Sequence, residues 1–124
     1  NAAAFIFAAK ILKKTGCPSP GGINPVRLGR EGERLAGIDP DAAKKGVDSV
    51  LHPGTKRFPD KITRSDLHES KNVKYLSYTG QLRDYSAITQ RDSLRFNLHT
   101  PSSTTFSRQL HQQIKSGNIN WIPY

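Results

Sequence analysis

Apolar residues recur at helical spacing in three stretches of the chain, which predict three helices. The clearest spans residues 77–92, with Ser77 or Thr79 as its N-cap and one apolar face. The residues on that face are Leu82, Tyr85, Ile88 and Thr89. A second helix is expected over residues 106–115, ended by Gly117, and a third over residues 27–36, ended by Gly37. Its inward residues are expected to be Leu28 and Leu35.

Strand patterns fill the stretches between these helices. Residues 94–99 alternate strictly between apolar and polar side chains, which is the clearest strand signal in the chain. Shorter extended segments are predicted at residues 47–52, 56–62, 67–75 and 118–122. The predicted order is a helix, three strands, a helix, a strand, a helix and a strand. Such an order is typical of an α/β domain with a central mixed sheet.

A Pro- and Gly-rich stretch separates the beginning of the chain from this domain. Residues 1–14 read as a short apolar helix with a basic end, and residues 15–25 as a linker. We therefore expect residues 1–25 to be a tether from a larger delivery protein, and residues 26–124 to form one domain. Cys17 is the single cysteine, so an internal disulfide is excluded, and no segment approaches the length of a membrane span.

The charge of the chain favours a polyanionic partner. Among 124 residues, 19 are Lys or Arg and 10 are Asp or Glu, which gives a formal net charge of +9. A strongly basic domain attracts nucleic acid, an anionic surface or an acidic protein. The charge does not distinguish DNA from RNA.

Asp60, Glu69 and Lys71 form the most informative motif. Asp60 follows Pro59, and Glu69 stands two positions before Lys71 on a predicted strand. Because side chains on a strand alternate between its faces, Glu69 and Lys71 are expected on the same face. Two carboxylates can share a divalent cation that polarises a phosphate, while a lysine orients or deprotonates the attacking water. This pattern is typical of a metal-dependent phosphodiesterase.

Further residues can complete a phosphate-binding site. Gln81 and Tyr85 are four apart on the predicted helix 77–92, so both lie on one helical face and could reach a phosphate. Basic residues near the motif could together follow a nucleic-acid backbone. They include Arg64, Lys74 and Arg83.

Several sequence blocks together resemble a known family of toxin domains. They are Gly-Arg-Glu-Gly-Glu-Arg-Leu-Ala-Gly-Ile (29–38), Phe-Pro-Asp (58–60), Glu-Ser-Lys-Asn-Val (69–73), Leu-Ser-Tyr-Thr-Gly-Gln-Leu-Arg-Asp (76–84), Leu-Arg-Phe-Asn-Leu (94–98) and Thr-Thr-Phe-Ser-Arg-Gln-Leu (104–110). From about Leu28 to Ile122 the chain resembles the restriction-endonuclease-fold toxin domains at the C-termini of bacterial polymorphic toxins, including contact-dependent growth inhibition proteins and Rhs-type effectors. The resemblance implies the PD-(D/E)XK nuclease core, αβββαβ, here with a further helix and strand.

The resemblance also implies roles for individual residues. Asp60 and Glu69 correspond to metal ligands and Lys71 to the water-orienting lysine. Glu33, or Glu31 in the same turn, corresponds to an additional acidic ligand on the first helix. Gln81 corresponds to the helix residue that completes the site.

The function implied is a metal-dependent endonuclease toxin used in interbacterial competition. Its carboxylate oxygens suit Mg²⁺ or Mn²⁺ better than a soft metal, with Zn²⁺ as an alternative. The substrate would be DNA or tRNA, cleaved in the cytoplasm of a target cell. A cognate immunity protein, expected to be acidic, would protect the producing cell. The oligomeric state stays open.

Two other functions are compatible with the same residues. A metal-independent ribonuclease could use His99 or His111 together with Thr104 and Tyr85. Alternatively, the domain could be a non-catalytic module that binds nucleic acid or protein, with structural rather than catalytic carboxylates.

Overall fold

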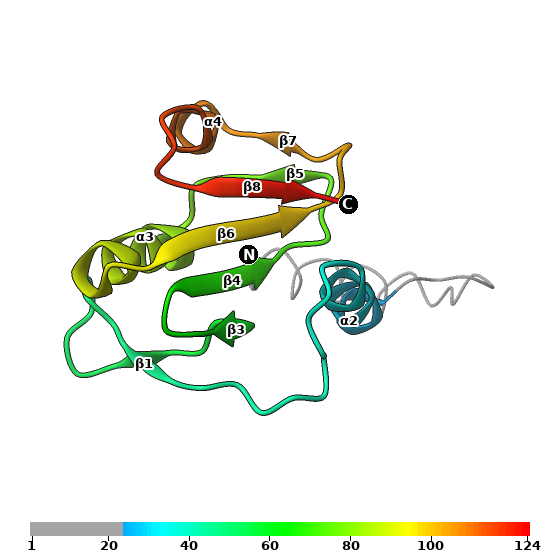
Figure 1. Ribbon diagram of the computed structural model, residues 1–124. Coiled ribbons are helices and arrows are strands. Elements are labelled where there is room, and N and C mark those ends of the chain that lie inside the picture. The colour runs from blue at the N-terminus through cyan, green and yellow to red at the C-terminus, as the bar shows by residue number, and fades with distance from the viewer. Residues whose placement is uncertain (1–23) are drawn as a thin grey trace, which may run out of the picture.

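A four-stranded mixed sheet forms the centre of the protein (Figure 1). The computed structural model describes residues 24–124, so the helix and most of the linker predicted at residues 1–25 lie outside the described part. The sheet has the order β3-β4-β6-β8, with β3 Lys61–Ile62, β4 Asp66–Ser70, β6 Arg95–Thr100 and β8 Asn120–Pro123. β3 pairs with β4 in antiparallel orientation, whereas β4, β6 and β8 run parallel.

Two helices make the connections between the parallel strands. Helix α3, Gly80–Asp92, lies between β4 and β6 in the chain, and helix α4, Arg108–Lys115, lies between β6 and β8. Two short strands in the same connections, β5 Tyr75–Leu76 and β7 Thr105–Phe106, pair in parallel. The α/β architecture with a central mixed sheet is thus confirmed, and it is compatible with a restriction-endonuclease-like fold.

Helix α3 begins and ends where local chemistry allows. The side chain of Thr79 accepts a hydrogen bond from the backbone N–H of Leu82, so Thr79 is the N-cap. At the other end Ser93 adopts the left-handed conformation, with φ 56°, and its N–H bonds back to the carbonyl of Thr89. The predicted apolar face of this helix is buried.

The core lies between α3 and one face of the sheet. Leu67 on β4 and Phe96 and Leu98 on β6 are all at most 1% exposed. The ring of Tyr85 on α3 packs edge-on against Phe96, with the ring centroids 6.0 Å apart. The buried cluster consists of Leu67, Leu76, Leu82, Tyr85, Ile88, Phe96, Leu98, Leu110 and Ile119.

The opposite face of the sheet carries a row of polar contacts. The alternation along β6 is correct, but its polar residues Asn97 and His99 are buried as well. Asn97 donates to the carboxylate of Asp66 at 2.9 Å, and the rings of His99 and His68 share a hydrogen bond of 2.9 Å. Because Asn97 and His99 are buried, their polar atoms pair with side chains of the neighbouring strand β4 instead of with water.

Helix α2, Pro25–Leu35, lies beside the carboxyl end of β4 (Figure 1). Gly32 makes the contact, since a Cβ there would stand 2.7 Å from the hydroxyl of Tyr124 and 2.8 Å from the Cβ of Asn72. The prediction that Leu35 faces inward is wrong, because this side chain is 55% exposed. Close packing through glycine, rather than through a leucine, sets the position of this helix. Gly37, with φ 78°, ends the helical segment as predicted.

The predicted strands at residues 47–52 and 56–62 are shorter than the patterns indicated. The first supplies only β1 Val47–Asp48, and the second divides into β2 Lys56–Arg57 and β3. β1 and β2 pair in a separate antiparallel ribbon, whereas β3 joins the central sheet. A buried carboxylate, Asp84 on α3, holds this ribbon by accepting hydrogen bonds from two backbone N–H groups, from the hydroxyl of Ser49 and from Arg57 at 2.7 Å. Burial opposes ionisation, but these donors outweigh it and lower the pKa of Asp84 to about 2.

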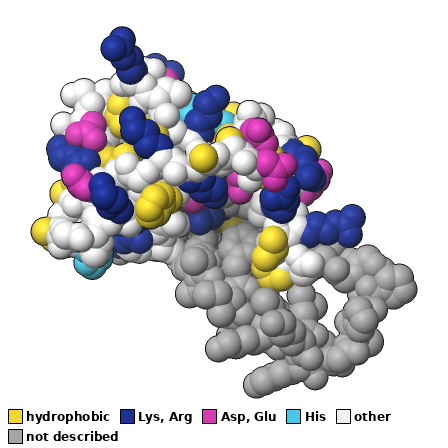
Figure 2. Space-filling view, turned by 90° about the horizontal axis from the view of Figure 1, so that it is seen from below, with side chains coloured by type: hydrophobic (Ala, Val, Ile, Leu, Met, Phe, Trp, Pro, Cys, Tyr) yellow, Lys and Arg dark blue, Asp and Glu magenta, His cyan; other side chains and the backbone are white. Residues whose placement is uncertain are grey.

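Basic side chains on one face of the protein are not gathered in a single stripe. Figure 2 shows Lys and Arg interspersed with acidic and apolar side chains on the face seen from below. Within residues 24–124, no helix combines the length and apolar character that crossing a bilayer requires.

Candidate active site

The antiparallel pairing of β3 with β4 brings Asp60 beside Glu69. Asp60 lies immediately before β3, and its backbone N–H donates to Glu69 Oε1 at 3.1 Å. In return, the backbone N–H of Ser70 donates to Asp60 Oδ2 at 2.8 Å. Each carboxylate therefore accepts a hydrogen bond from a main-chain N–H at or next to the other acidic residue. This exchange holds Asp60 and Glu69 together, although they are nine positions apart in sequence.

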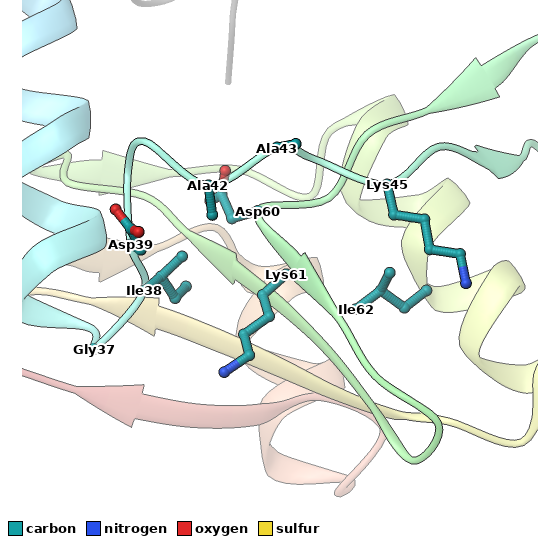
Figure 3. A pocket seen from close by; sticks show the side chains of 9 residues that line it. All are labelled: Gly37, Ile38, Asp39, Ala42, Ala43, Lys45, Asp60, Lys61 and Ile62. Atoms are coloured by element: carbon teal, nitrogen blue, oxygen red, sulfur yellow. The ribbon is translucent and has the colours of Figure 1, made fainter.

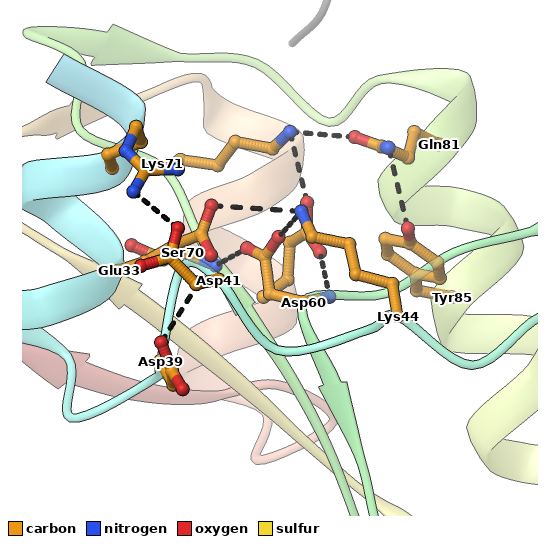
Figure 4. Close-up of polar contacts among 11 residues, drawn as sticks. Glu33, Asp39, Asp41, Lys44, Asp60, Ser70, Lys71, Gln81 and Tyr85 are labelled. Carbon is orange, nitrogen blue, oxygen red and sulfur yellow. Dashed lines mark hydrogen bonds and ion pairs between the residues drawn. The ribbon is translucent and has the colours of Figure 1, made fainter. Parts of the chain in front are cut away.

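Lys71 and Glu69 form a buried ion pair, as their spacing on the strand predicts. Lys71 Nζ lies 3.1 Å from Glu69 Oε2, and the two side chains are only 8% and 5% exposed. The ammonium also donates to Gln81 Oε1 at 2.8 Å (Figure 4). Although Lys71 lies beyond the end of β4, its backbone N–H still bonds to His99 on β6 at 2.8 Å, which extends the strand geometry to Lys71.

Gln81 and Tyr85 share one face of α3, but they have different surroundings. Gln81 is half-buried at the site, whereas Tyr85 is fully buried and packs on Phe96. The predicted contact of Tyr85 with nucleic acid stays a prediction, and the ring of Tyr85 belongs to the core. Its hydroxyl reaches Gln81 Nε2 at 3.4 Å. Burial raises the pKa of Tyr85, so the hydroxyl stays protonated and helps to position Gln81.

A lysine outside the predicted set of site residues joins Glu33 to the site. Lys44 Nζ lies 2.7 Å from Asp60 Oδ1 and 3.7 Å from Glu33 Oε1. Of the two acidic residues considered on α2, Glu33 is thus the one directed at Asp60. Glu31 instead pairs with Arg34 at 3.4 Å, and both of those side chains are more than half exposed. Lys44 stands in an irregular segment between α2 and β1, where no periodic pattern marks it.

Burial makes ionisation of the carboxylates costly. Desolvation raises the pKa of Glu69 from its ordinary value of 4.5 to about 7, against the opposing charge of Lys71. Desolvation and then the neighbouring charge of Asp60 raise the pKa of Glu33 as well. Carboxyl groups that have raised pKa values and lie close to one another are typical of functional sites. In such sites the negative charges are stabilised by partners other than water.

The donor chemistry of this cluster fits a hard divalent cation. Glu33, Asp60 and Glu69 supply carboxylate oxygens, and the positively charged group of Lys44 already stands against two of them. Glu33 Oε2 is buried and has no hydrogen-bond partner. Within residues 24–124, however, no group of three or more His, Cys, Asp or Glu side chains is arranged to hold a metal ion. Lysine ammonium groups and main-chain N–H groups contact the carboxylate oxygens of Asp60 and Glu69.

A pocket of about 320 Å³ opens next to Asp60 (Figure 3). Its wall includes the exposed residues Ala42 and Ala43, from the segment that carries Lys44. Two lysines, Lys45 and Lys61, and two aspartates, Asp39 and Asp60, also line it, so its wall carries charges of both signs. The space lies beside the carboxylate cluster and borders the segment between α2 and β1.

The structure does not draw the three predicted backbone-binding cations into the cluster. Arg64 and Lys74 are exposed, on the turn before β4 and just before β5. Arg83 is also exposed, but its guanidinium bonds to Gln109 at 2.7 Å and covers the ring of Tyr78 at 4.5 Å. A role in binding nucleic acid stays a prediction for all three.

The histidines considered for a metal-independent ribonuclease lie apart from the other residues of that scheme. His99 is on the sheet face opposite the core, where it pairs with His68, whereas Tyr85 packs on the other face. His111 is exposed on α4, and the hydroxyl of Thr104 donates to the carbonyl of Val73 at 2.6 Å. Side chains separated in this way do not form one acid–base site.

The comparisons with known proteins bear on the family of the chain. No curated protein and no solved structure matches the chain significantly. A family model described as restriction endonuclease fold toxin 7 matches residues 29–110, which is more than half of the chain and includes Glu33, Asp60, Glu69, Lys71 and Gln81. The match confirms the resemblance inferred from the sequence blocks and supports nuclease toxin activity. The chain belongs to the restriction endonuclease fold toxin 7 family.

Proposed function

We propose that the protein is a metal-dependent endonuclease toxin that hydrolyses phosphodiester bonds of nucleic acid. The observation that carries the proposal is the convergence of Glu69 and Gln81 on the ammonium of Lys71, with Asp60 hydrogen-bonded to Glu69. Burying these charges is expensive, and a structural role alone would be served at least as well by apolar residues of similar volume. The family to which the chain belongs supports the same chemistry.

The proposed roles follow from the contacts of each side chain. Lys71 is held by Glu69 and Gln81 and keeps a further proton free for a phosphate oxygen or a water. Gln81 fixes the direction of that ammonium, because its own amide is in reach of Tyr85. Lys71 therefore orients the attacking water or stabilises charge on the phosphate.

Glu33, Asp60 and Glu69 are the proposed ligands of a divalent cation, most simply Mg²⁺, with Mn²⁺ and Zn²⁺ as alternatives. When bound, the cation supplies Lewis-acid polarisation of the scissile phosphate and activation of the attacking water. The residues of the chain supply its position, since main-chain N–H groups of Asp60 and Ser70 fix the two neighbouring carboxylates.

The proposed substrate is DNA or tRNA, which the net charge of +9 helps to attract. Arg64, Lys74 and Arg83 are the proposed contacts to the nucleic-acid backbone. We place the activity in the cytoplasm of a target bacterium, reached as the C-terminal part of a delivered toxin. An acidic immunity protein that covers the site is the proposed inhibitor in the producing cell.

A cleavage assay tests the proposal. The purified protein, freed of any inhibitor, is incubated with supercoiled plasmid and with total tRNA, each in Mg²⁺ and in EDTA. We expect cleavage of one substrate in Mg²⁺ alone. Lys71→Ala should lower the rate by a factor on the order of 10²–10⁴, the range for loss of a positioned general acid–base or electrostatic group.

Lys56→Ala is the matched control, because this lysine is 60% exposed and pairs only with the exposed Asp48. Its rate should equal that of the wild type. Cleavage that persists in EDTA and in Lys71→Ala would refute the proposed site. Binding without any cleavage would instead indicate a non-catalytic module.

A further inference from the structure

Lys44 is placed where a cation is expected to bind. Its ammonium lies 2.7 Å from Asp60 Oδ1 and 3.7 Å from Glu33 Oε1 (Figure 4). The residue comes from the irregular segment between α2 and β1, 16 positions before Asp60. The contact is therefore made by tertiary structure and not by neighbours within one element.

The charges at the site show why an ammonium is held there. Glu33, Asp60 and Glu69 contribute three carboxylates, and Lys71 neutralises only Glu69 directly. Without Lys44 the charges of Asp60 and Glu33 would face each other in a partly buried place. Coulomb attraction to a cation is strong where two carboxylates are partly buried. The cationic group that contacts both carboxylates is the ammonium of Lys44.

The oxygens that Lys44 contacts are the ones left over by the rest of the fold. Asp60 Oδ2 accepts from the N–H of Ser70, and both oxygens of Glu69 accept from the chain. Asp60 Oδ1 and Glu33 remain, and Lys44 is directed at both. A divalent cation that uses Asp60 Oδ1 and Glu33 as ligands would need the same space as this ammonium.

The segment that carries Lys44 lies on the surface of the protein. Residues 41–45 are all exposed, and the pocket of about 320 Å³ lies beside Ala42 and Ala43. The side chain of Lys44 itself is 38% exposed, so water is available to receive its charge. Moving it away from the carboxylates therefore does not require the core to open.

We propose that Lys44 is a built-in counterion that occupies the cation position of the metal-free site and competes with the divalent metal for Asp60 and Glu33. This inference rests on the proposed metal-dependent function. Lys44 is a positioning residue: it keeps the carboxylates together before the metal arrives and leaves when the metal binds. Removing the charge of Lys44 should lower the stability of the metal-free protein and raise its affinity for the metal.

The experiment measures Mn²⁺ binding to the full chain by calorimetry and the melting temperature with and without Mn²⁺. Lys44→Met keeps the apolar stem and removes the charge, while Lys44→Arg keeps the charge. We expect Lys44→Met to bind Mn²⁺ roughly three- to fivefold more tightly, the factor that corresponds to a partly exposed ion pair. Its metal-free form should melt a few degrees lower, and its gain in melting temperature on adding Mn²⁺ should exceed that of the wild type.

Lys45→Met is the matched control, since Lys45 is the exposed neighbour on the same segment and lines the pocket. It should bind Mn²⁺ like the wild type, and Lys44→Arg should remain within about twofold of the wild type. Unchanged or weaker binding by Lys44→Met would overturn the inference. If the wild type binds Mn²⁺ and Glu69→Gln does not, the proposed metal site stands even when the role of Lys44 fails. If the wild type binds no Mn²⁺, both are refuted.

Discussion

Replacing Glu69 by Gln should make the metal-free protein more stable at alkaline pH, although it removes a residue of the proposed active site. The carboxyl of Glu69 is 5% exposed, and burial raises its pKa from an ordinary 4.5 to about 7. Between these two pH values the folded protein holds a proton that the unfolded chain releases. Stability from this group is therefore fully present below about pH 4.5 and is lost as the pH rises through 7.

The size of the effect follows from the same two values. Each pKa unit corresponds to 1.36 kcal/mol, so ionised Glu69 costs the folded state about 3 kcal/mol at pH values above 7. The glutamine side chain imitates the protonated form of Glu69 at every pH. In the variant, Lys71 therefore has an uncharged neighbour, as it does beside protonated Glu69 in the wild type. Glu69→Gln should thus match the wild type near pH 4.5 and exceed its free energy of unfolding by about 3 kcal/mol near pH 8.

Urea unfolding in EDTA, monitored through the fluorescence of the single tryptophan, Trp121, measures this difference at several pH values. Glu31→Gln is the matched control, because the carboxyl of Glu31 is 52% exposed. The control should follow the wild type across the range within about 0.5 kcal/mol. A difference between Glu69→Gln and the wild type that does not change from about pH 5 to about pH 8 would refute the reasoning from burial.

Two further substitutions test the packing that supports the site. Gly32→Ala should destabilise the protein by about 1–3 kcal/mol and lower its nuclease activity. The reason is that the added Cβ would stand 2.7 Å from the hydroxyl of Tyr124 and push α2, with Glu33, away from β4. Thermal unfolding measures the stability and the cleavage assay the activity, and an unchanged melting temperature would contradict the close contact. Asp84→Asn should cost about 2–4 kcal/mol at neutral pH, since it removes the charge that binds Arg57 at 2.7 Å. Because the pKa of Asp84 is lowered to about 2, its contribution is lost as the pH falls below about 4, so the difference measured by urea unfolding should narrow there; a constant difference would count against the ionic part of the explanation.

Local patterns predicted the elements whose side chains repeat regularly. The apolar spacing in α3, its cap at Thr79 and the side-chain period of β4 all follow from the backbone geometry of a single element. The face shared by Glu69 and Lys71 could be predicted for the same reason, and the structure confirms it with a 3.1 Å ion pair. Asp60 could be predicted only as part of a motif, because its partners are on another strand.

Positions fixed by distant contacts escaped prediction. Leu35 reads as an inward residue on a helix, but the contact of α2 is made through Gly32 against Tyr124, at the other end of the chain. Tyr85 reads as a residue that reaches a phosphate, but the depth of α3 in the core buries its ring. Burial depth depends on which elements pack together, and one element's periodicity does not contain it.

By itself, the sequence determined the α/β order, the family blocks and the candidates Asp60, Glu69 and Lys71. Only the tertiary structure decided how these charges meet. The β3–β4 pairing places Asp60 beside Glu69, and the position of α2 turns Glu33, not Glu31, toward the site. An irregular segment places Lys44 against Asp60 and Glu33. The physical reason is that electrostatic interactions depend on distance and burial in space, and both are set by packing between segments that are far apart along the chain.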